Sequence, residues 1–159
     1  MTKSLQARAI WGVGPAIFRW TGVWFALTVA AHFLLYPRFV IGPLTTGAAI
    51  AIGATLVVIG TVLYLLTWRH LLRGLRAGQL VTDGPFRFVR HPLYAIGVFL
   101  LTPGVCVMFR SWLVLTTPVV MFVAARVLVA REEASLANHF GERWNAYRDQ
   151  TGALAPRWR

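Results

Sequence analysis

Four apolar stretches dominate this sequence, and a bilayer core of about 30 Å requires helices of about 20 apolar residues. They predict transmembrane helices at residues 16–36, 44–68, 92–109 and 112–130. Charged residues make up only 13% of the chain, against about 25% in an average soluble domain. We therefore expect one all-α domain, a polytopic membrane helix bundle, in which residues 131–159 form a cytoplasmic helical extension.

The distribution of positive charge predicts the orientation of this bundle. The formal net charge is +11, and the basic residues include Lys3, Arg8 and five arginines in the 69–91 loop. The opposite side of the predicted bundle carries only Arg38 and Arg110. This asymmetry follows the positive-inside rule, so both termini and the large loop are expected in the cytoplasm. The counter-charges are then lipid headgroups rather than nucleic acid, in a multi-pass protein of a prokaryotic inner membrane.

The third and fourth apolar stretches are separated only by Arg110-Ser111, which leaves room for a very tight turn. Two helices joined in this way must lie antiparallel. The third helix is expected to start near Pro92, because proline is favourable in a first helical turn, and to bend near Pro103. The hairpin returns the charged end of the fourth helix to the membrane face on which the third begins.

Two groups of polar residues consequently share one face of the predicted bundle. They are Arg87, Arg90, His91 and Tyr94 before the third helix, and Arg126, Arg131, Glu132 and Glu133 at the end of the fourth. Ionisable groups at a membrane edge are functional candidates by default. Adjacent glutamates on a helix point about 100° apart, so one could bind a ligand cation while the other pairs with an arginine. The alternative is a purely structural ion pair between a glutamate and Arg87 or Arg90.

Several other chemistries do not fit the pattern of residues. Gly12-Val13-Gly14 follows no strand and lacks the third glycine of a dinucleotide-binding loop. His91 and His139 stand apart from any cysteine ligand, so no metal site is expected. Cys106 is the only cysteine and lies inside an apolar stretch, where it is expected to be a small buried side chain.

The order of residues around the two polar groups is more specific than their composition. Arg90-His91-Pro92-Leu93-Tyr94 resembles the Arg-His-Pro-x-Tyr signature of the integral-membrane methyltransferase superfamily. That superfamily includes isoprenylcysteine carboxyl methyltransferases and phospholipid N-methyltransferases. A second run, from Glu132-Glu133 through Gly141-Glu142 to Pro156, is similar to the other half of the signature, although Trp144 stands where many relatives have tyrosine. The resemblance covers residues 80–158.

This resemblance implies an S-adenosylmethionine-dependent methyltransferase that acts on a lipid-like or amphipathic substrate, either an isoprenylcysteine carboxylate or a phospholipid amine. The implied catalytic residues are Glu133 and Arg131. The implied cofactor-binding residues are Arg90, His91, Pro92, Leu93, Tyr94, Gly97, Glu132 and Glu133. The resemblance does not distinguish O-, N- and S-methylation, and either Arg126 or Arg131 could be the arginine that serves the site.

The chemistry of these side chains agrees with such a cofactor. Arginine and histidine suit its carboxylate, glutamate suits its ammonium group, and an aromatic face such as that of Tyr94 suits its sulfonium. Two other functions are compatible with the same composition. One is a non-enzymatic helical-bundle scaffold, and the other is a membrane reductase that uses NADPH, since sterol reductases have a related carboxy-terminal region.

Overall fold

The computed structural model describes residues 12–157, and within this range the regular structure is helical. Lys3 and Arg8, which support the predicted orientation, lie outside the described residues. Three helices are long and apolar enough to cross a membrane: α2 (Gly14–Leu34), α3 (Thr46–Arg76) and α6 (Thr117–Phe140), the last preceded by the short turn η3 (Val114–Thr116). A shorter apolar helical run, Pro92–Val107, consists of α4 (Pro92–Ile96), the π-helical turn η2 (Gly97–Leu101) and α5 (Thr102–Val107).

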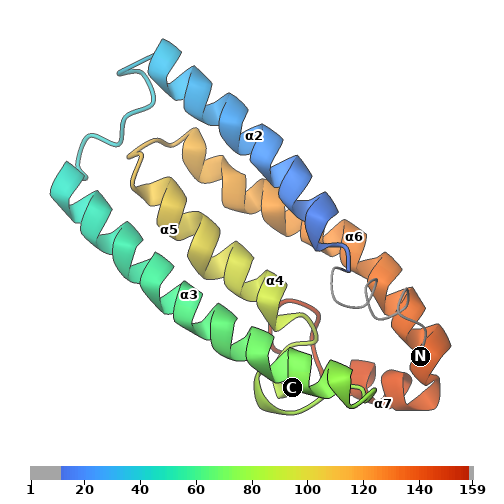
Figure 1. Cartoon of the computed structure of the whole chain (residues 1–159). Coiled ribbons are helices and arrows are strands. Elements are labelled where there is room, and N and C mark those ends of the chain that lie inside the picture. Colours follow the sequence, from blue (N-terminus) through green and yellow to red (C-terminus); the bar gives the residue numbers. More distant parts are fainter. Residues whose placement is uncertain (1–11, 158–159) are drawn as a thin grey trace.

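The helices lie side by side, with the α4–α5 run between α3 and α6 and with α2 along the other side of α6 (Figure 1). The predicted antiparallel hairpin is confirmed, because α5 and α6 pack together after a tight turn in which Arg110 has a φ of +50°. Small residues allow α3 to approach α5 closely. A Cβ on Gly53 would lie 2.5 Å from the carbonyl oxygen of Gly104, so this contact requires glycine.

The third apolar helix departs from regular α-helical geometry just before Pro103. Proline has no N–H group, and its ring would collide with the carbonyl group of the residue four positions earlier in a regular helix. The chain widens instead into the turn η2, where the N–H of Thr102 donates to the carbonyl oxygen of Gly97. The predicted disturbance at Pro103 is therefore present as a π-helical turn, and the helix ends at Val107 rather than Phe109.

Two helices continue beyond their predicted membrane spans. The predicted second helix stops at residue 68, but α3 continues to Arg76 through a segment in which polar residues alternate with leucines. The predicted helical extension beyond residue 130 is confirmed for α6, which passes this point without a break and ends at Phe140. A short helix, α7 (Glu142–Gln150), follows after Gly141, whose φ of +54° favours glycine. Each apolar stretch ends where the side chains become polar, whereas the backbone hydrogen bonds of the helix continue beyond that point.

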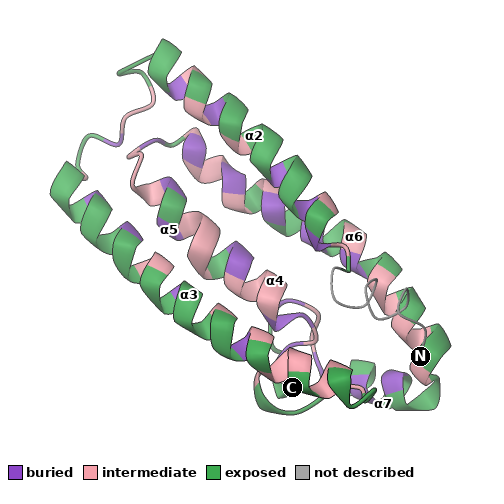
Figure 2. Ribbon diagram, in the orientation of Figure 1, coloured by how far each residue is buried: buried purple, intermediate pink, exposed green. Residues whose placement is uncertain are grey.

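The outer faces of the long helices are apolar and exposed (Figure 2). Large side chains such as Phe18, Leu27 and Phe33 on α2 and Val58 on α3 are more than half exposed. An exposed apolar surface of this extent is expected to contact lipid. The buried core is small and lies between α2, η2 and α6, where the members of one cluster are Ile17, Val98, Met121, Ala125 and Leu154. Leu154 belongs to the segment after α7, so this segment packs into the bundle.

Candidate functional site

A cavity of about 1080 Å³ occupies the end of the bundle where α2 and α4 begin and α3 ends. Pockets for small molecules usually measure about 300–1,000 Å³, so this one is large enough for a cofactor with a second ligand beside it. Its polar lining comes from four segments: α3, the start of α4 with the loop before it, α6 and α7. The charged or titratable residues among them are Tyr64, Arg90, His91, Tyr94, Arg131, Glu132, His139 and Tyr147. The two halves of the sequence signature therefore meet around one cavity.

Glu132 is the glutamate that lines this cavity. Its Oε2 atom accepts a hydrogen bond from the Tyr94 hydroxyl at 3.0 Å and another from the backbone N–H of Val13 at 3.3 Å. The ring of His91 stacks on the ring of Tyr94, with centroids 5.8 Å apart and planes 15° apart. The carboxylate is thus held by one residue from α4 and one from the segment before α2.

Glu133 makes a different set of contacts. Its Oε1 atom accepts from Nε of Arg90 at 2.8 Å and lies 3.2 Å from Nε2 of His91. Nδ1 of His91 is 3.9 Å from Oε1 of Glu132, so the buried imidazole lies between the two carboxylates. Glu133 does not line the large cavity but a smaller one of about 230 Å³. One glutamate therefore faces the cavity while the other pairs with an arginine.

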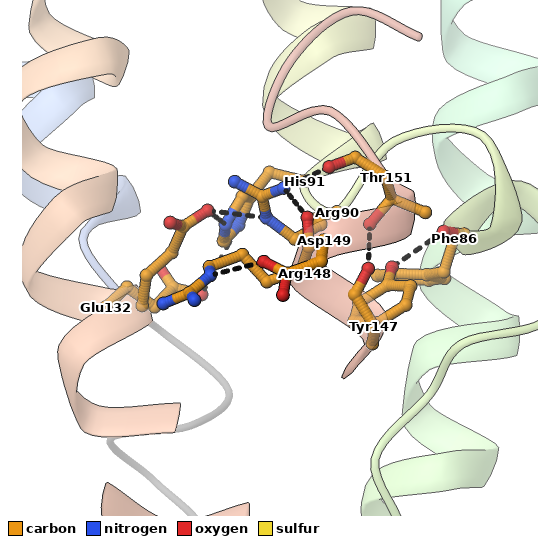
Figure 3. A network of polar contacts seen from close by, with 9 residues as sticks. Phe86, Arg90, His91, Glu132, Tyr147, Arg148, Asp149 and Thr151 are labelled. Carbon is orange, nitrogen blue, oxygen red and sulfur yellow. Dashed lines mark hydrogen bonds and ion pairs between the residues drawn. The ribbon is translucent and has the colours of Figure 1, made fainter. Parts of the chain in front are cut away.

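The segment after α7 holds Arg90 and His91 in place (Figure 3). Nη1 of Arg90 donates to the carbonyl oxygens of Arg148, at 3.0 Å, and Thr151. The backbone N–H groups of Arg90 and His91 donate to the carbonyl oxygens of Gly152, at 2.8 Å, and Ala153, at 3.0 Å. The loop before α4 is consequently joined to the segment after α7 by backbone hydrogen bonds and one isolated β-bridge, Val89–Gly152, which fixes the positions of the Arg90 and His91 side chains.

Aromatic residues of α7 secure the same segment from the other side. The Tyr147 hydroxyl donates to the carbonyl oxygen of Phe86 at 2.6 Å. Burial raises the pKa of Tyr147 to about 12, so the hydroxyl keeps its proton at neutral pH. Trp144 is buried beside these two residues and packs with them in a second apolar cluster. The indole of Trp144 therefore contributes packing at the edge of the cavity.

The other residues expected in the site fall into two groups. Arg131 and the residues Arg90 to Tyr94 line the large cavity, whereas Arg126 lines the smaller one. Gly97 is buried and lines neither; a Cβ there would lie 2.7 Å from Cε of Met121. Gly97 therefore serves the contact between η2 and α6 at this position.

Part of the cavity wall was missed by the sequence reasoning. The segment from Gly12 to Pro15 and the side chain of Phe18 line it, as do Tyr64 and Trp68, one turn apart on α3. Gly12 has a φ of +47°, and a Cβ on it would lie 2.7 Å from Oε2 of Glu132. The signal in the sequence was the pair of glycines before the first apolar stretch, which allows the backbone to approach a partner closely.

These observations define a class of protein: an all-α bundle with long apolar helices, an exposed apolar exterior and a polar cavity at one end. The comparison with family models places the chain more narrowly, because residues 44–143, more than half of it, match the phospholipid methyltransferase family. The chain belongs to this family, whose members are S-adenosylmethionine-dependent methyltransferases, and it is an integral, multi-pass membrane protein. No curated protein and no solved structure matches the chain. Because members of this family are methyltransferases, neither the non-enzymatic scaffold nor the NADPH-dependent reductase is the principal function of this chain.

Proposed function

We propose that this enzyme transfers the methyl group of S-adenosylmethionine to the head-group amine of a lipid-like substrate, and that both bind in the large cavity. The observation that carries the proposal is the position of Glu132, whose carboxylate lines a cavity of about 1080 Å³ together with the Arg90–Tyr94 motif. A carboxylate accepts hydrogen bonds and protons, and it repels another carboxylate. The lining therefore favours an amine acceptor over the carboxylate of an isoprenylcysteine.

The proposed placement in the membrane follows the distribution of charge. Residues 14–34, 46–68, 92–109 and 112–130 would span the bilayer as one domain, with the cavity at the cytoplasmic face. The elements at the end that holds the cavity carry Arg69, Arg73, Arg76, Arg87, Arg90, Arg131, Arg143 and Arg148. Arg38 and Arg110 belong to the α2–α3 loop and the α5–α6 turn, which meet at the other end. The helical part of the third span, Pro92–Val107, has only 16 residues, about 24 Å of helix, so its ends would lie near the limits of the hydrocarbon core.

The residues that line the cavity fit the chemistry of the cofactor. When bound, S-adenosylmethionine supplies a methyl group on a sulfonium, ready for direct displacement. Arg131 and His139 would hold its carboxylate, and aromatic faces such as those of Tyr94 and Trp68 would contact the cation. Pro92 and Leu93 contribute apolar wall beside them. Exclusion of water by these walls would strengthen the polar contacts inside the cavity.

Glu132 would act on the acceptor. An ammonium group has no lone pair, so the acceptor amine must lose a proton before it can attack the methyl carbon. The carboxylate of Glu132 can take this proton, and its orientation is set by Tyr94 and the backbone N–H of Val13. Glu133 would be a positioning residue, because it contacts Arg90 and His91 and does not line the cavity.

The acceptor would reach the cavity from the side, through the bilayer. The wall formed by Phe18 of α2 and Tyr64 of α3 lies on helices whose outer faces are apolar and exposed. A lipid head group could pass between these side chains while its acyl chains remain in hydrocarbon. Such a path would avoid the cost of transferring acyl chains through water, about 0.8 kcal/mol per CH₂ group.

The test is a transfer assay with purified protein, a radiolabelled methyl donor and a fractionated lipid extract. We expect label in a lipid amine, and we expect Glu132→Gln to lower the rate about 100-fold, because proton transfer by a positioned side chain contributes about 10²–10⁴-fold. Glu142→Gln is the matched control, since Glu142 is an exposed glutamate of α7 outside the cavity. Label that appears only as a base-labile ester would refute the amine acceptor. Failure to bind the methyl donor or its demethylated product, in detergent and in lipid, would refute the proposed cavity.

A further inference from the structure

The smaller cavity lies next to the site but has a different lining. It has a volume of about 230 Å³. Arg90 lines both cavities, whereas Glu133 lines only the smaller one and Glu132 only the large one. Its remaining lining comes from α6 and from the segment after α7: Arg126, Val129, Ala130, Ala153 and Leu154. Among the residues that the structure describes, Arg90 is the one that the linings of the two cavities share.

Arg126 is the unusual residue of this cavity. It lies two helical turns before Glu133, about 10 Å deeper along α6, inside the segment 112–130 that is proposed to span the membrane. Its side chain is exposed, and no hydrogen bond or ion pair joins it to another residue between 12 and 157. A guanidinium at such a depth is costly unless it meets an anion or extends to the interface.

Arg90 can contribute further donors to the same cavity. A guanidinium has five N–H groups. In Arg90, Nε is paired with Glu133, and Nη1 donates to the carbonyl oxygens of Arg148 and Thr151. Nη2 has no hydrogen-bond partner in the part of the chain that the structure describes. Its two N–H groups can therefore bind an anion without breaking the pair with Glu133.

The charges and the apolar lining of this cavity point to the class of anion that it would bind. Arg90, Arg126 and Glu133 together carry a formal charge of +1 when ionised, which matches the single negative charge of a phosphodiester. The apolar lining by Val129 and Leu154 suits the glycerol and first methylene groups of a lipid. We propose that this cavity binds the phosphate of an anionic phospholipid such as phosphatidylglycerol, between Arg126 and Nη2 of Arg90. This lipid has no amine, so it is a bound membrane component and not the methyl acceptor.

The test measures retention of phosphatidylglycerol by the purified protein in detergent, using native mass spectrometry and no methyl donor. We expect the wild type to retain one lipid with preference over the others, and Arg126→Gln to bind it at least about 10-fold more weakly, the loss expected for hydrogen bonds to a charged group. Arg73→Gln should retain the lipid like the wild type, because Arg73 is an exposed arginine of α3 outside this cavity. Arg126→Lys keeps the charge but loses the forked donors, so its affinity for the lipid should lie between those of the wild type and Arg126→Gln.

Three results would overturn the proposal. Equal retention by Arg126→Gln and the wild type would show that Arg126 is not part of the site. An equal loss in Arg73→Gln would reduce the effect to general surface charge. Displacement of the lipid by inorganic phosphate would identify a site for a free anion instead. Because the measurement involves no cofactor or methyl transfer, its failure would leave the proposed methyltransferase reaction unaffected.

Discussion

The contact between Glu133 and the Arg90–His91 pair allows a quantitative prediction. One carboxylate oxygen of Glu133 accepts from Arg90 at 2.8 Å and lies 3.2 Å from His91. The side chains of Arg90 and Glu133 are 10% and 19% exposed, so the pair is neither fully buried nor free in solvent. Glu133→Gln keeps an acceptor oxygen but removes the charge, which leaves the guanidinium without its ionic partner.

The expected loss of stability lies between two limits. Exposed ion pairs contribute up to about 1 kcal/mol, whereas removal of one partner from a buried pair costs about 3–5 kcal/mol. For this partly buried pair we expect about 2 kcal/mol. In a chain of this length each kcal/mol shifts the melting temperature by about 2–4 °C, so Glu133→Gln should lower it by about 4–8 °C.

Thermal unfolding of the detergent-solubilised protein measures this effect, with Glu142→Gln as the control. Arg90→Gln should lower the melting temperature further, because the carbonyl groups of Arg148 and Thr151 then lose their donor as well. The double variant should resemble Arg90→Gln alone, since the two residues share one interaction. A wild-type melting temperature for Glu133→Gln, or strictly additive losses in the double variant, would refute the positioning role of Glu133.

Three further perturbations test other contacts. Tyr94→Phe removes the hydroxyl that orients Glu132, and the rate of methyl transfer should fall about five-fold in the radiolabel assay. An unchanged rate would count against the role of this contact. Trp144→Ala removes a side chain that is only 2% exposed, which should cost about 3–5 kcal/mol of folding stability. The melting temperature should then fall by roughly 10 °C, and a small change would show that the cluster repacks. The hydrogen bond from His70 lowers the pKa of Asp83 below its usual value, so its stabilisation is present above about pH 4 and is lost as the pH falls through the lowered pKa. Asp83→Asn should remove this part of the acid dependence of unfolding.

Hydropathy alone predicted the helical regions and the hairpin, because long apolar stretches in a membrane have few alternatives to helix. It did not locate the residues at which α3 and α6 end. There the helices leave the predicted spans and continue with polar side chains, which a hydropathy pattern treats as loop or extension. The continuation of α3 to Arg76 and of α6 to Phe140 depends on backbone hydrogen bonds and on packing around the cavity.

The sequence predicted which residues belong to the candidate site but not how their side chains contact one another. The sequence predicted that the two glutamates would point apart, yet the choice of Glu132 for the cavity depends on how α6 is rotated against α4. The contact between Glu132 and the backbone N–H of Val13 joins residues 119 positions apart, and a backbone donor leaves no signature in the side-chain pattern. Gly97 belongs to the signature region, but its contact with Met121 is set by the π-helical turn.

The packing of Leu154 among the membrane-level helices has a consequence for how the molecule opens. Leu154 is 3% exposed in the same cluster as Ile17 and Met121, and the neighbouring residues are paired with the backbone of Arg90 and His91. Separation of this segment would expose an apolar side chain and break these two backbone hydrogen bonds at the same time, so local opening there is coupled to loss of the core. The amide hydrogens of Arg90 and His91 should then exchange with solvent at rates close to those of the helix interiors, although the segment that protects them has no regular secondary structure.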